Sequence, residues 1–390
     1  MRLTYKHTIL SCFAGYIVQA VVNNYVPLLF ITFQDTYAIP LSQITLLVTF
    51  NFGIQLLTDL VAAKYVDRMG YRLSIVLAHV FSALGLLLLT ILPEVMDPFA
   101  GILISVMVYA VGGGLLEVLV SPIMESCPTD NKEAAMSLLH SFYCWGHVGV
   151  VLVSTAFFHF LGIESWKALA WIWALIPVCN GLVFVKAPIA PLISEEGSGM
   201  TFGQLFRNKT FWLLMVMMVC SGASEQSVSQ WASALAEEGL GISKTLGDLA
   251  GPMSFAVCMG LARLVYGKYG EKIPLEKFMM GSTALCVSSY LLISLSPWPA
   301  LSLVGCAVCG LSVGIMWPGT FSTAAASLRT GGTAMFALLA LGGDLGCSGG
   351  PTLVGLVSDA LGGNMKLGIL AGIVFPVTMA LCLFGKRKKA

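Results

Sequence analysis

Long hydrophobic runs separated by short polar turns are the main pattern of this chain. Each run has about the ~20 residues that a helix needs to cross the hydrocarbon core of a bilayer. The pattern therefore predicts an all-α membrane protein with twelve transmembrane helices. The predicted spans are residues 8–32, 43–63, 73–92, 99–123, 134–158, 165–185, 210–236, 245–267, 276–294, 298–324, 332–357 and 365–385.

One polar connection is much longer than the others and divides the spans six and six. It contains the segment PIAPLISEEGSG, with Pro, Gly and charged residues. We therefore expect an N-terminal six-helix bundle over 1–188, a cytoplasmic linker over 189–208 and a C-terminal six-helix bundle over 209–390.

Basic residues are distributed unevenly between the two sides of the predicted membrane. With the N-terminus inside, 18 of the 21 Lys and Arg residues fall on the inner side, and only Lys167, Lys244 and Lys366 fall outside. By the positive-inside rule both termini are cytoplasmic. Short loops suit a bacterial inner, or plasma, membrane. The acidic residues Glu237, Glu238 and Asp248, at the outer ends of spans 7 and 8, are expected to be solvated.

The composition excludes a soluble protein. Hydrophobic residues make up 57% and charged residues 11% of the chain, whereas soluble domains carry about 25% charged residues. A net charge of +1 gives no indication of a nucleic-acid partner. The 11 cysteines lie mostly inside apolar runs, which suits packing rather than a disulfide framework. No ATP-binding Walker motif occurs, and neither a cofactor nor a metal is expected.

The two halves resemble each other at an offset near 200 residues. Gly70 aligns with Gly270 and Gly114 with Gly314, on matching spans. An internal duplication of this kind is typical of secondary transporters, whose site lies near the membrane midplane between the halves. We expect the protein to act as a monomer in the lipid bilayer.

With twelve spans, a central cytoplasmic loop and a basic turn between spans 2 and 3, the chain resembles the major facilitator superfamily. The turn between spans 2 and 3 is similar to that family's G-x-x-x-D-R-x-G-x-R/K pattern, with Ala63 in place of the first Gly. The resemblance implies that this turn is a conformational latch and not a substrate site. The latch residues are Asp67, Arg68, Gly70 and Arg72, with Arg263 in the second half.

Three further segments resemble the fucose permease-like branch of that superfamily. They are NNYVP in span 1, GLLEVLVSP in span 4 and GASEQSVSQW in span 7. The resemblance implies that Glu117 is a coupling acid, Glu225 the acid of the span-7 site and Trp231 its aromatic partner. Asn23 stands where that branch has an acid, so strict fucose specificity does not follow.

Span 7 turns polar halfway along its length. Glu225, Gln226 and Ser229 share about half of the helix circumference with several other polar residues. A carboxylate near the middle of a membrane span costs at least ~2.5 kcal/mol, so this face must meet water, a ligand or another polar helix. We interpret span 7 as the lining of a pathway. Trp231 lies outside this polar arc, so either the SGAS segment is unwound or Trp231 packs between helices.

Span 1 carries a second polar patch. Gln19 and Asn23 lie on one helix face and Asn24 lies beside them. Hydrogen bonds between helices are one explanation. Contact with substrate is the other, because Asn24 aligns with Ser224 of span 7 at the 200-residue offset.

Span 4 places Glu117 in the membrane after a run of glycines. The acid either has a functional role or is a buried carboxyl held by His140 of span 5. The counterpart of Glu117 in the second half is Trp317. A carboxylate that faces an aromatic side chain across a cavity is suited to binding a ligand with a hydroxylated ring. Tyr143, also on span 5, either lines the cavity or packs in the core. His140 and His147 have no third ligand at useful spacing, so no metal site is predicted.

Span 11 holds Asp344 near its centre. Gly342, Gly346 and Gly350 recur every four residues and predict a smooth face for close helix packing. If that face packs on a neighbour, Asp344 points the opposite way, into the cavity. The alternative is a structural acid paired with Arg263. A proton-coupled carrier needs a buried carboxyl, and the candidates are Glu117, Glu225 and Asp344.

The sequence favours a secondary transporter of a small polar solute, a sugar or related hydroxylated compound, driven by the proton gradient. Export of amphipathic compounds and a non-transporting sensor remain open. A membrane-embedded enzyme is not favoured, because no nucleophile accompanies Glu117 and His140, the one candidate acid–base pair. The candidate substrate residues are Gln19, Asn23, Asn24, Glu117, His140, Tyr143, Glu225, Gln226, Ser229, Trp231 and Trp317.

Overall fold

A computed structural model describes residues 3–128, 132–190, 200–269, 273–328 and 331–387. Within its helices the side chains of residues 63–64, 67–68, 132–137, 140, 267–269, 332–334 and 386–387 are outside the description. Three predicted site residues, Asp67, Arg68 and His140, belong to this group. The chain forms two compact units, Met1–Ser194 (unit 1) and Glu195–Ala390 (unit 2), whose boundary falls inside the predicted linker.

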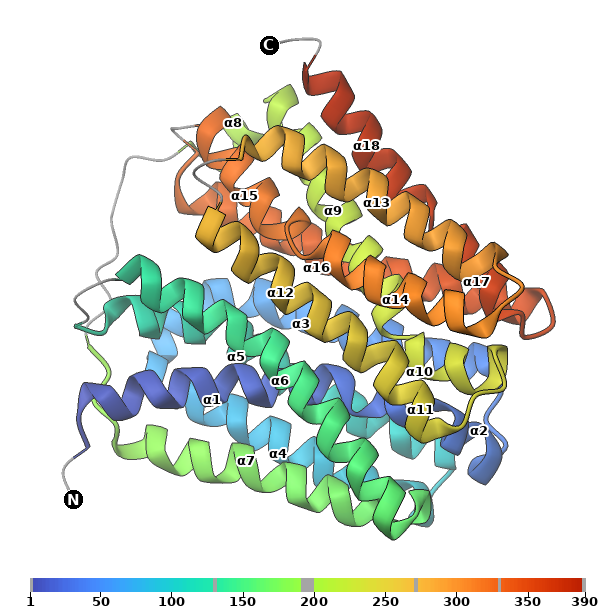
Figure 1. The fold of residues 1–390 in the computed structure, drawn as a ribbon. Coiled ribbons are helices and arrows are strands. Elements are labelled where there is room, and N and C mark those ends of the chain that lie inside the picture. Colours follow the sequence, from blue (N-terminus) through green and yellow to red (C-terminus); the bar gives the residue numbers. More distant parts are fainter. Residues whose placement is uncertain (1–2, 129–131, 191–199, 270–272, 329–330, 388–390) are drawn as a thin grey trace. The chain divides into compact units, whose positions relative to one another are not determined.

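Unit 1 consists of helices joined by short turns (Figure 1). Its elements are α1 (Tyr5–Asn24), the 3₁₀ turn η1 (Val26–Leu29), α2 (Phe30–Tyr37), α3 (Leu41–Met69), α4 (Tyr71–Val95), α5 (Pro98–Ser126), α6 (Lys132–Leu161), the 3₁₀ turn η2 (Ile163–Ser165) and α7 (Trp166–Lys186).

Unit 2 repeats this plan with more interruptions. Its elements are α8 (Phe202–Phe206), α9 (Lys209–Ser229), α10 (Ala232–Ala234), the π-helical η3 (Leu235–Gly239), α11 (Lys244–Asp248), the π-helical η4 (Leu249–Met253), α12 (Ser254–Tyr269), α13 (Leu275–Leu295), α14 (Pro299–Val313), α15 (Met316–Ser327), α16 (Gly332–Ala360), α17 (Met365–Ala371) and α18 (Val374–Arg387). The short α8 lies inside the predicted linker.

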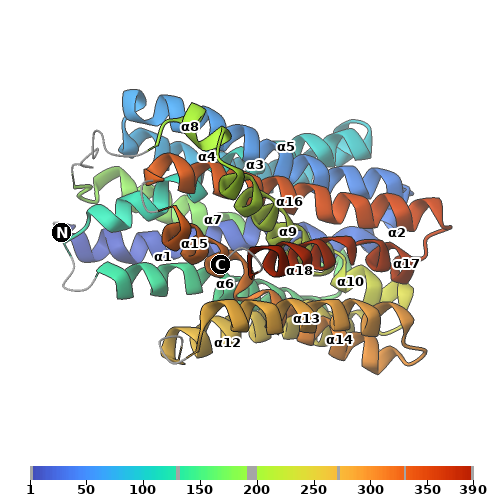
Figure 2. The ribbon, with the colours of Figure 1, turned by 90° about the horizontal axis from the view of Figure 1, so that it is seen from above.

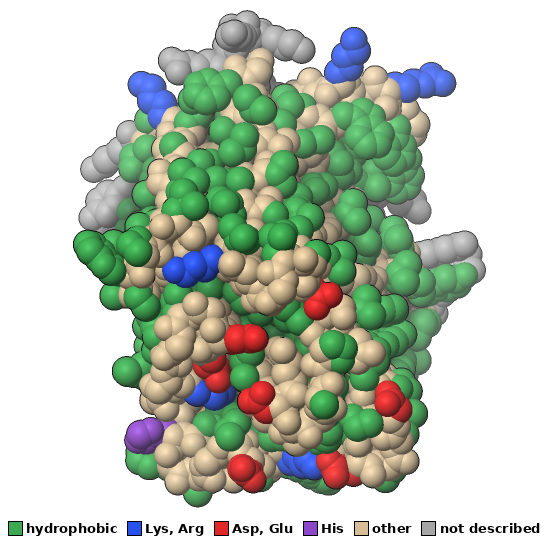
Figure 3. Space-filling model, turned by 90° about the vertical axis from the view of Figure 1, so that its right-hand side faces the viewer, with side chains coloured by type: hydrophobic (Ala, Val, Ile, Leu, Met, Phe, Trp, Pro, Cys, Tyr) green, Lys and Arg blue, Asp and Glu red, His purple; other side chains and the backbone are tan. Residues whose placement is uncertain are grey.

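The helices match the predicted membrane spans. Eleven helical segments of the described chain are long and apolar enough to cross a membrane. The remaining predicted span, 332–357, coincides with α16, whose 29 residues extend about 43 Å at 1.5 Å per residue. Hydrophobic side chains cover much of the face seen in Figure 3, and several Asp and Glu side chains reach the surface there. The all-α membrane fold predicted from the sequence is confirmed.

Glycines set the closest helix contact in unit 1, between α4 and α5. A Cβ on Gly85 would lie 2.4 Å from the backbone nitrogen of Tyr109, and one on Gly112 would lie 2.5 Å from that of Ser82. Only glycine allows the two backbones to approach so closely. The buried His79 of α4 adds a polar tie, because its Nε2 lies 2.8 Å from Nδ2 of Asn180 on α7.

The glycine face predicted for span 11 packs on α9 in unit 2, which confirms the prediction. A Cβ on Gly346 would lie 2.0 Å from the carbonyl oxygen of Val219, and one on Gly350 would lie 2.6 Å from that of Ala223. Gly342 meets the sulfur of Met215. Elsewhere in this unit α12, α13 and α14 lie side by side (Figure 2).

The two units share one helix order, but the offset between equivalent helices is not constant. It is 204 residues from the start of α1 at Tyr5 to that of α9 at Lys209, and 199 from the start of α7 at Trp166 to that of α17 at Met365. The fixed offset of 200 therefore misaligns spans 1 and 7 by about one turn. Asn24 and Ser224 are not equivalent.

The first long helix of each unit is interrupted just beyond its polar segment. In unit 1 the break follows Asn24, and Pro27 explains it because proline has no N–H to donate to the Asn23 carbonyl one turn earlier. In unit 2 the break falls at Gln230 and Trp231, so the SGAS segment itself is helical. The unwinding of SGAS that the sequence allowed does not occur.

Candidate functional site

The polar patch of span 1 faces a carboxylate within unit 1. Gln19 donates from Nε2 to Oε2 of Glu117 at 2.7 Å, which joins α1 to α5 inside the membrane-spanning region. One turn away, the hydroxyls of Tyr16 and Ser121 lie 3.1 Å apart. The sequence predicted both Gln19 and Glu117 but not their contact. A hydrogen bond to an acid inside a membrane is a strong constraint on both helices.

A chain of amides continues this network toward α3. Asn51 and Gln55 both donate to Oδ1 of Asn23, at 3.2 and 2.8 Å, and Asn23 donates from Nδ2 to the hydroxyl of Tyr143 on α6 at 3.5 Å. Sequence reasoning missed Asn51 and Gln55. Their spacing of four residues, with the buried Asp59 four residues further on, was the available signal.

One residue of span 1, Asn24, bonds to its own helix rather than to this network. Asn24 donates from Nδ2 to the carbonyl of Ala20 in its own helix at 2.9 Å. That contact is a local one just before the helix break, and the structure gives no support to a substrate role for Asn24. The side chain of His140, the predicted partner of Glu117, lies outside the described residues.

In unit 2 the acid of span 7 is buried and surrounded by amides. Glu225 is 8% exposed, and Gln226 donates to its Oε1 at 3.2 Å. Gln230 in turn donates to Gln226 at 3.0 Å. Ser229, on the same helix, is also buried. The predicted polar face of α9 is thus a hydrogen-bonded row in the membrane interior.

The arginine predicted as a latch lies near this acid. Nη2 of Arg263 on α12 is 3.9 Å from Oε2 of Glu225, and its Nε donates to the carbonyl of Gly314 at 3.3 Å. The sequence had offered Arg263 as a partner for Asp344. The recorded ion pair joins it to Glu225, while Asp344 is buried on α16 with 6% exposed.

The two tryptophans occupy different environments. Trp231 is fully buried and donates from Nε1 to the carbonyl of Pro351 on α16 at 2.9 Å, so it packs between helices. Of the two alternatives that the sequence left open for Trp231, packing between helices is therefore the correct one. Trp317 is half-buried at the start of α15, and its ring lies against Gly343, where a Cβ would come within 2.1 Å.

The segment that joins spans 7 and 8 holds a largely buried charge cluster. The prediction of solvation is therefore wrong for Glu237 and Asp248, whereas Glu238 is exposed as predicted. Nζ of Lys244 lies 2.9 Å from Oε1 of Glu237 and 3.2 Å from Oδ2 of Asp248. Ser233 donates to the Asp248 carboxylate. Asp248 is fully buried, because the π-helical segments fold the hairpin around it.

The turn between α3 and α4 has the geometry that its residues predict. Gly70 has φ +86°, a conformation that favours glycine. Nη1 of Arg72 donates to the carbonyls of Phe184 and Val185 at 2.8 and 2.9 Å, near the C-terminal end of α7. Arg72 thus fastens the turn to the last helix of its own unit. Asp67 and Arg68 have side chains outside the description.

Two units of membrane-spanning helices with buried polar rows define an integral membrane protein of the transporter class. The family model described as Major Facilitator Superfamily matches residues 9–351, and the chain belongs to this superfamily. Its members carry small solutes across membranes. Among curated proteins no sequence match is found.

Solved structures of the same fold include other membrane transporters. A bacterial homologue of the human lysosomal transporter Spinster, in an inward-facing and occupied conformation, has a TM-score of 0.78 at 14% identity, covering 99% of this chain and 97% of that one. The E. coli fucose:proton symporter FucP, as a single-residue variant, has a TM-score of 0.66 at 16% identity, covering 98% of this chain and 99% of that one. At such identities the likeness shows the fold alone.

Proposed function

We propose that the protein is a proton-coupled secondary transporter of a small hydroxylated solute, a sugar or a related compound. The observation that carries this proposal is the network formed by Gln19, Glu117, Asn23, Asn51 and Gln55 within the membrane. Amides and carboxylates together can recognise several hydroxyls at once, because an amide offers both a donor and an acceptor while an ionised carboxylate offers two acceptor oxygens.

One atom of this network supports ligand binding in particular. Oε1 of Gln19 is buried and has no hydrogen-bond partner among the described residues, although the same side chain donates to Glu117. A buried acceptor without a partner costs about 1–3 kcal/mol. A hydroxyl or amino group of a bound solute would satisfy it, and would lie next to the Glu117 carboxylate.

The proposed coupling groups are the membrane carboxyls Glu117, Glu225 and Asp344. Protonation of one of them would be linked to occupancy, since a proton on Glu117 changes which groups can bond to Gln19. Arg263 would compete with a proton for Glu225, from which its Nη2 is 3.9 Å away. In the alternating-access mechanism proposed here the two units rock, and the Gly70–Arg72 turn acts as a latch.

The experiment is counterflow in proteoliposomes, with labelled monosaccharides, amino sugars and amphipathic drugs as solutes. Gln55→Ala should reduce sugar counterflow by roughly tenfold, the effect of losing about 1.4 kcal/mol. Gln43→Ala, on the same helix but outside the network, is the matched control. Glu117→Gln should abolish proton-driven uptake.

Other outcomes would replace the proposal. Counterflow of drugs with no sugar response would favour an exporter of amphipathic compounds. A thermal shift with sugar, without any counterflow in either direction, would favour a sensor with a carrier fold. Equal loss in Gln55→Ala and Gln43→Ala would remove the amide network from the binding site.

A further inference from the structure

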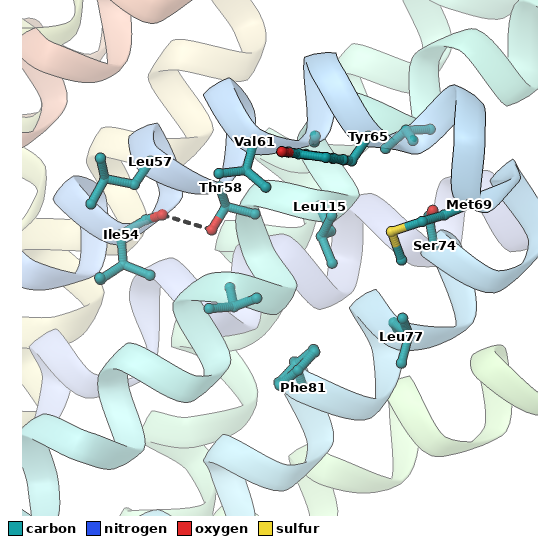
Figure 4. Close-up of a pocket in the computed structure, with 13 residues that line it drawn as sticks. Ile54, Leu57, Thr58, Val61, Tyr65, Met69, Ser74, Leu77, Phe81 and Leu115 are labelled. Atoms are coloured by element: carbon teal, nitrogen blue, oxygen red, sulfur yellow. Dashed lines mark hydrogen bonds between the residues drawn. The ribbon is translucent and has the colours of Figure 1, made fainter.

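Unit 1 has an open groove between α3, α4 and α5, on the side of the Gly70 turn (Figure 4). Its volume is about 340 Å³. α3 and α4 are its two walls, and Val111 and Leu115 of α5 also line it. The remaining lining residues are Ile54, Leu57, Thr58, Val61, Ala62, Tyr65, Val66, Met69, Ser74, Leu77 and Phe81.

The residues that line the groove favour an apolar ligand. The two small hydroxyls in it are already bonded to their own helices, Thr58 to the carbonyl of Ile54 at 2.7 Å and Ser74 to that of Gly70 at 3.1 Å. A sugar would therefore find no open polar group along most of this surface. An aliphatic chain would restore the van der Waals contacts that the groove walls lack.

The groove also lies where aliphatic chains are available. Leu57 and Val61 are each 56% exposed on the flank of a membrane-spanning helix, so the groove opens toward the surface that meets lipid. Its position is distinct from the Gln19–Glu117 network, whose residues do not line it.

Positive charge lies at the end of the groove near the turn. Arg72 is exposed and falls in sequence between two lining residues, Met69 and Ser74. Basic residues at the end of a membrane helix attract anionic headgroups by about 1 kcal/mol each.

We propose that this groove binds one acyl chain of an anionic phospholipid, with its phosphate at the basic turn. The apolar walls hold the chain and the turn selects the headgroup. Because α3 and α4 are the two helices joined by the latch turn, a bound chain wedges between them and stabilises the arrangement seen here.

The test is native mass spectrometry of the whole protein, delipidated in detergent and titrated with phosphatidylglycerol or phosphatidylcholine. Leu77→Trp fills the groove and should weaken phosphatidylglycerol binding roughly tenfold, equivalent to about two methylenes of chain contact. Leu182→Trp, on the exposed flank of α7 and outside the groove, is the matched control. Val61→Trp, at a more exposed lining position, serves if Leu77→Trp fails to fold.

Each result decides the assignment. Binding of one phosphatidylglycerol that is lost in the groove variants and kept in Leu182→Trp supports it. Equal binding by both groove variants and the control overturns the site. Equal binding of the two lipids overturns the anionic headgroup. Displacement of phosphatidylglycerol by a transported solute would overturn the lipid assignment and give the groove to the solute.

Discussion

Lys244 is the residue whose removal tests most directly what holds together the segment between α9 and α12 of unit 2. Its ammonium has three acceptors within reach: Oε1 of Glu237 at 2.9 Å, Oδ2 of Asp248 at 3.2 Å and Oγ of Ser233 at 3.4 Å. The lysine side chain is 18% exposed, that of Glu237 16% and that of Asp248 0%. One positive charge thus serves two carboxylates that have little access to water.

Lys244→Met keeps most of the side-chain volume but leaves both carboxylates without their counter-charge. With an effective dielectric constant of about 20, each lost attraction is about 5–6 kcal/mol before desolvation is counted. Since the lysine no longer has to be desolvated, the net loss is smaller. Breaking a buried pair from one side typically costs 3–5 kcal/mol, and the partial exposure of Glu237 places our expectation at about 3 kcal/mol.

The measurement is fluorescence-detected unfolding of the purified protein in detergent. Lys366→Met is the matched control, because Lys366 is also near a helix end but donates to a backbone carbonyl, that of Ser296, at 2.8 Å. Its loss should cost about 1 kcal/mol. Adding Glu237→Gln and Asp248→Asn to Lys244→Met should restore much of the stability. If Lys244→Met is no worse than the control, the cluster is not a buried ion pair and our reasoning fails.

Three further predictions concern packing and backbone geometry, all read from unfolding midpoints. Gly346→Ala should destabilise unit 2 by about 1–3 kcal/mol, because its Cβ would lie 2.0 Å from the Val219 carbonyl, whereas Gly349→Ala, with nothing within 4 Å, should be neutral. Equal effects of the two would contradict the helix contact. Asn180→Ala should lower the free energy of unfolding by about 2 kcal/mol, because the Ser11 carbonyl and His79 Nε2 both lose the amide that binds them. Gly70→Ala should cost about 1–2 kcal/mol, since φ is +86°; an unchanged midpoint would show that the turn relaxes.

The fold could be predicted from the sequence because membrane spans and small-residue faces are local patterns. The twelve runs specify helices by length and hydrophobicity alone. The recurrence of Gly342, Gly346 and Gly350 every four residues identified a packing face before any partner was known. These features depend on neighbours in one helix, which a sequence displays directly.

The site was predicted only in part, because hydrogen-bond partners come from other helices. Gln19 and Glu117 stood out as polar residues in apolar runs, but nothing in the sequence tied them together. Asn51 and Gln55 were overlooked although they recur with Asp59 every four residues of span 2, because their bonds to Asn23 come from another helix. The charge cluster was misread because solvation depends on how the hairpin folds back on Asp248.

The interruptions in α1 and α9 have a mechanical consequence. A continuous helix transmits bending and twisting along its whole length through its hydrogen bonds, whereas a break localises them. Asn24 and Ser229 end the polar portions, and α-helix begins again at Phe30 and Ala232. Each unit therefore contains a joint directly beside its polar row. Torque applied to the portion beyond the break is absorbed at that joint, so this portion can bend while the side chains of the polar row keep their spacing.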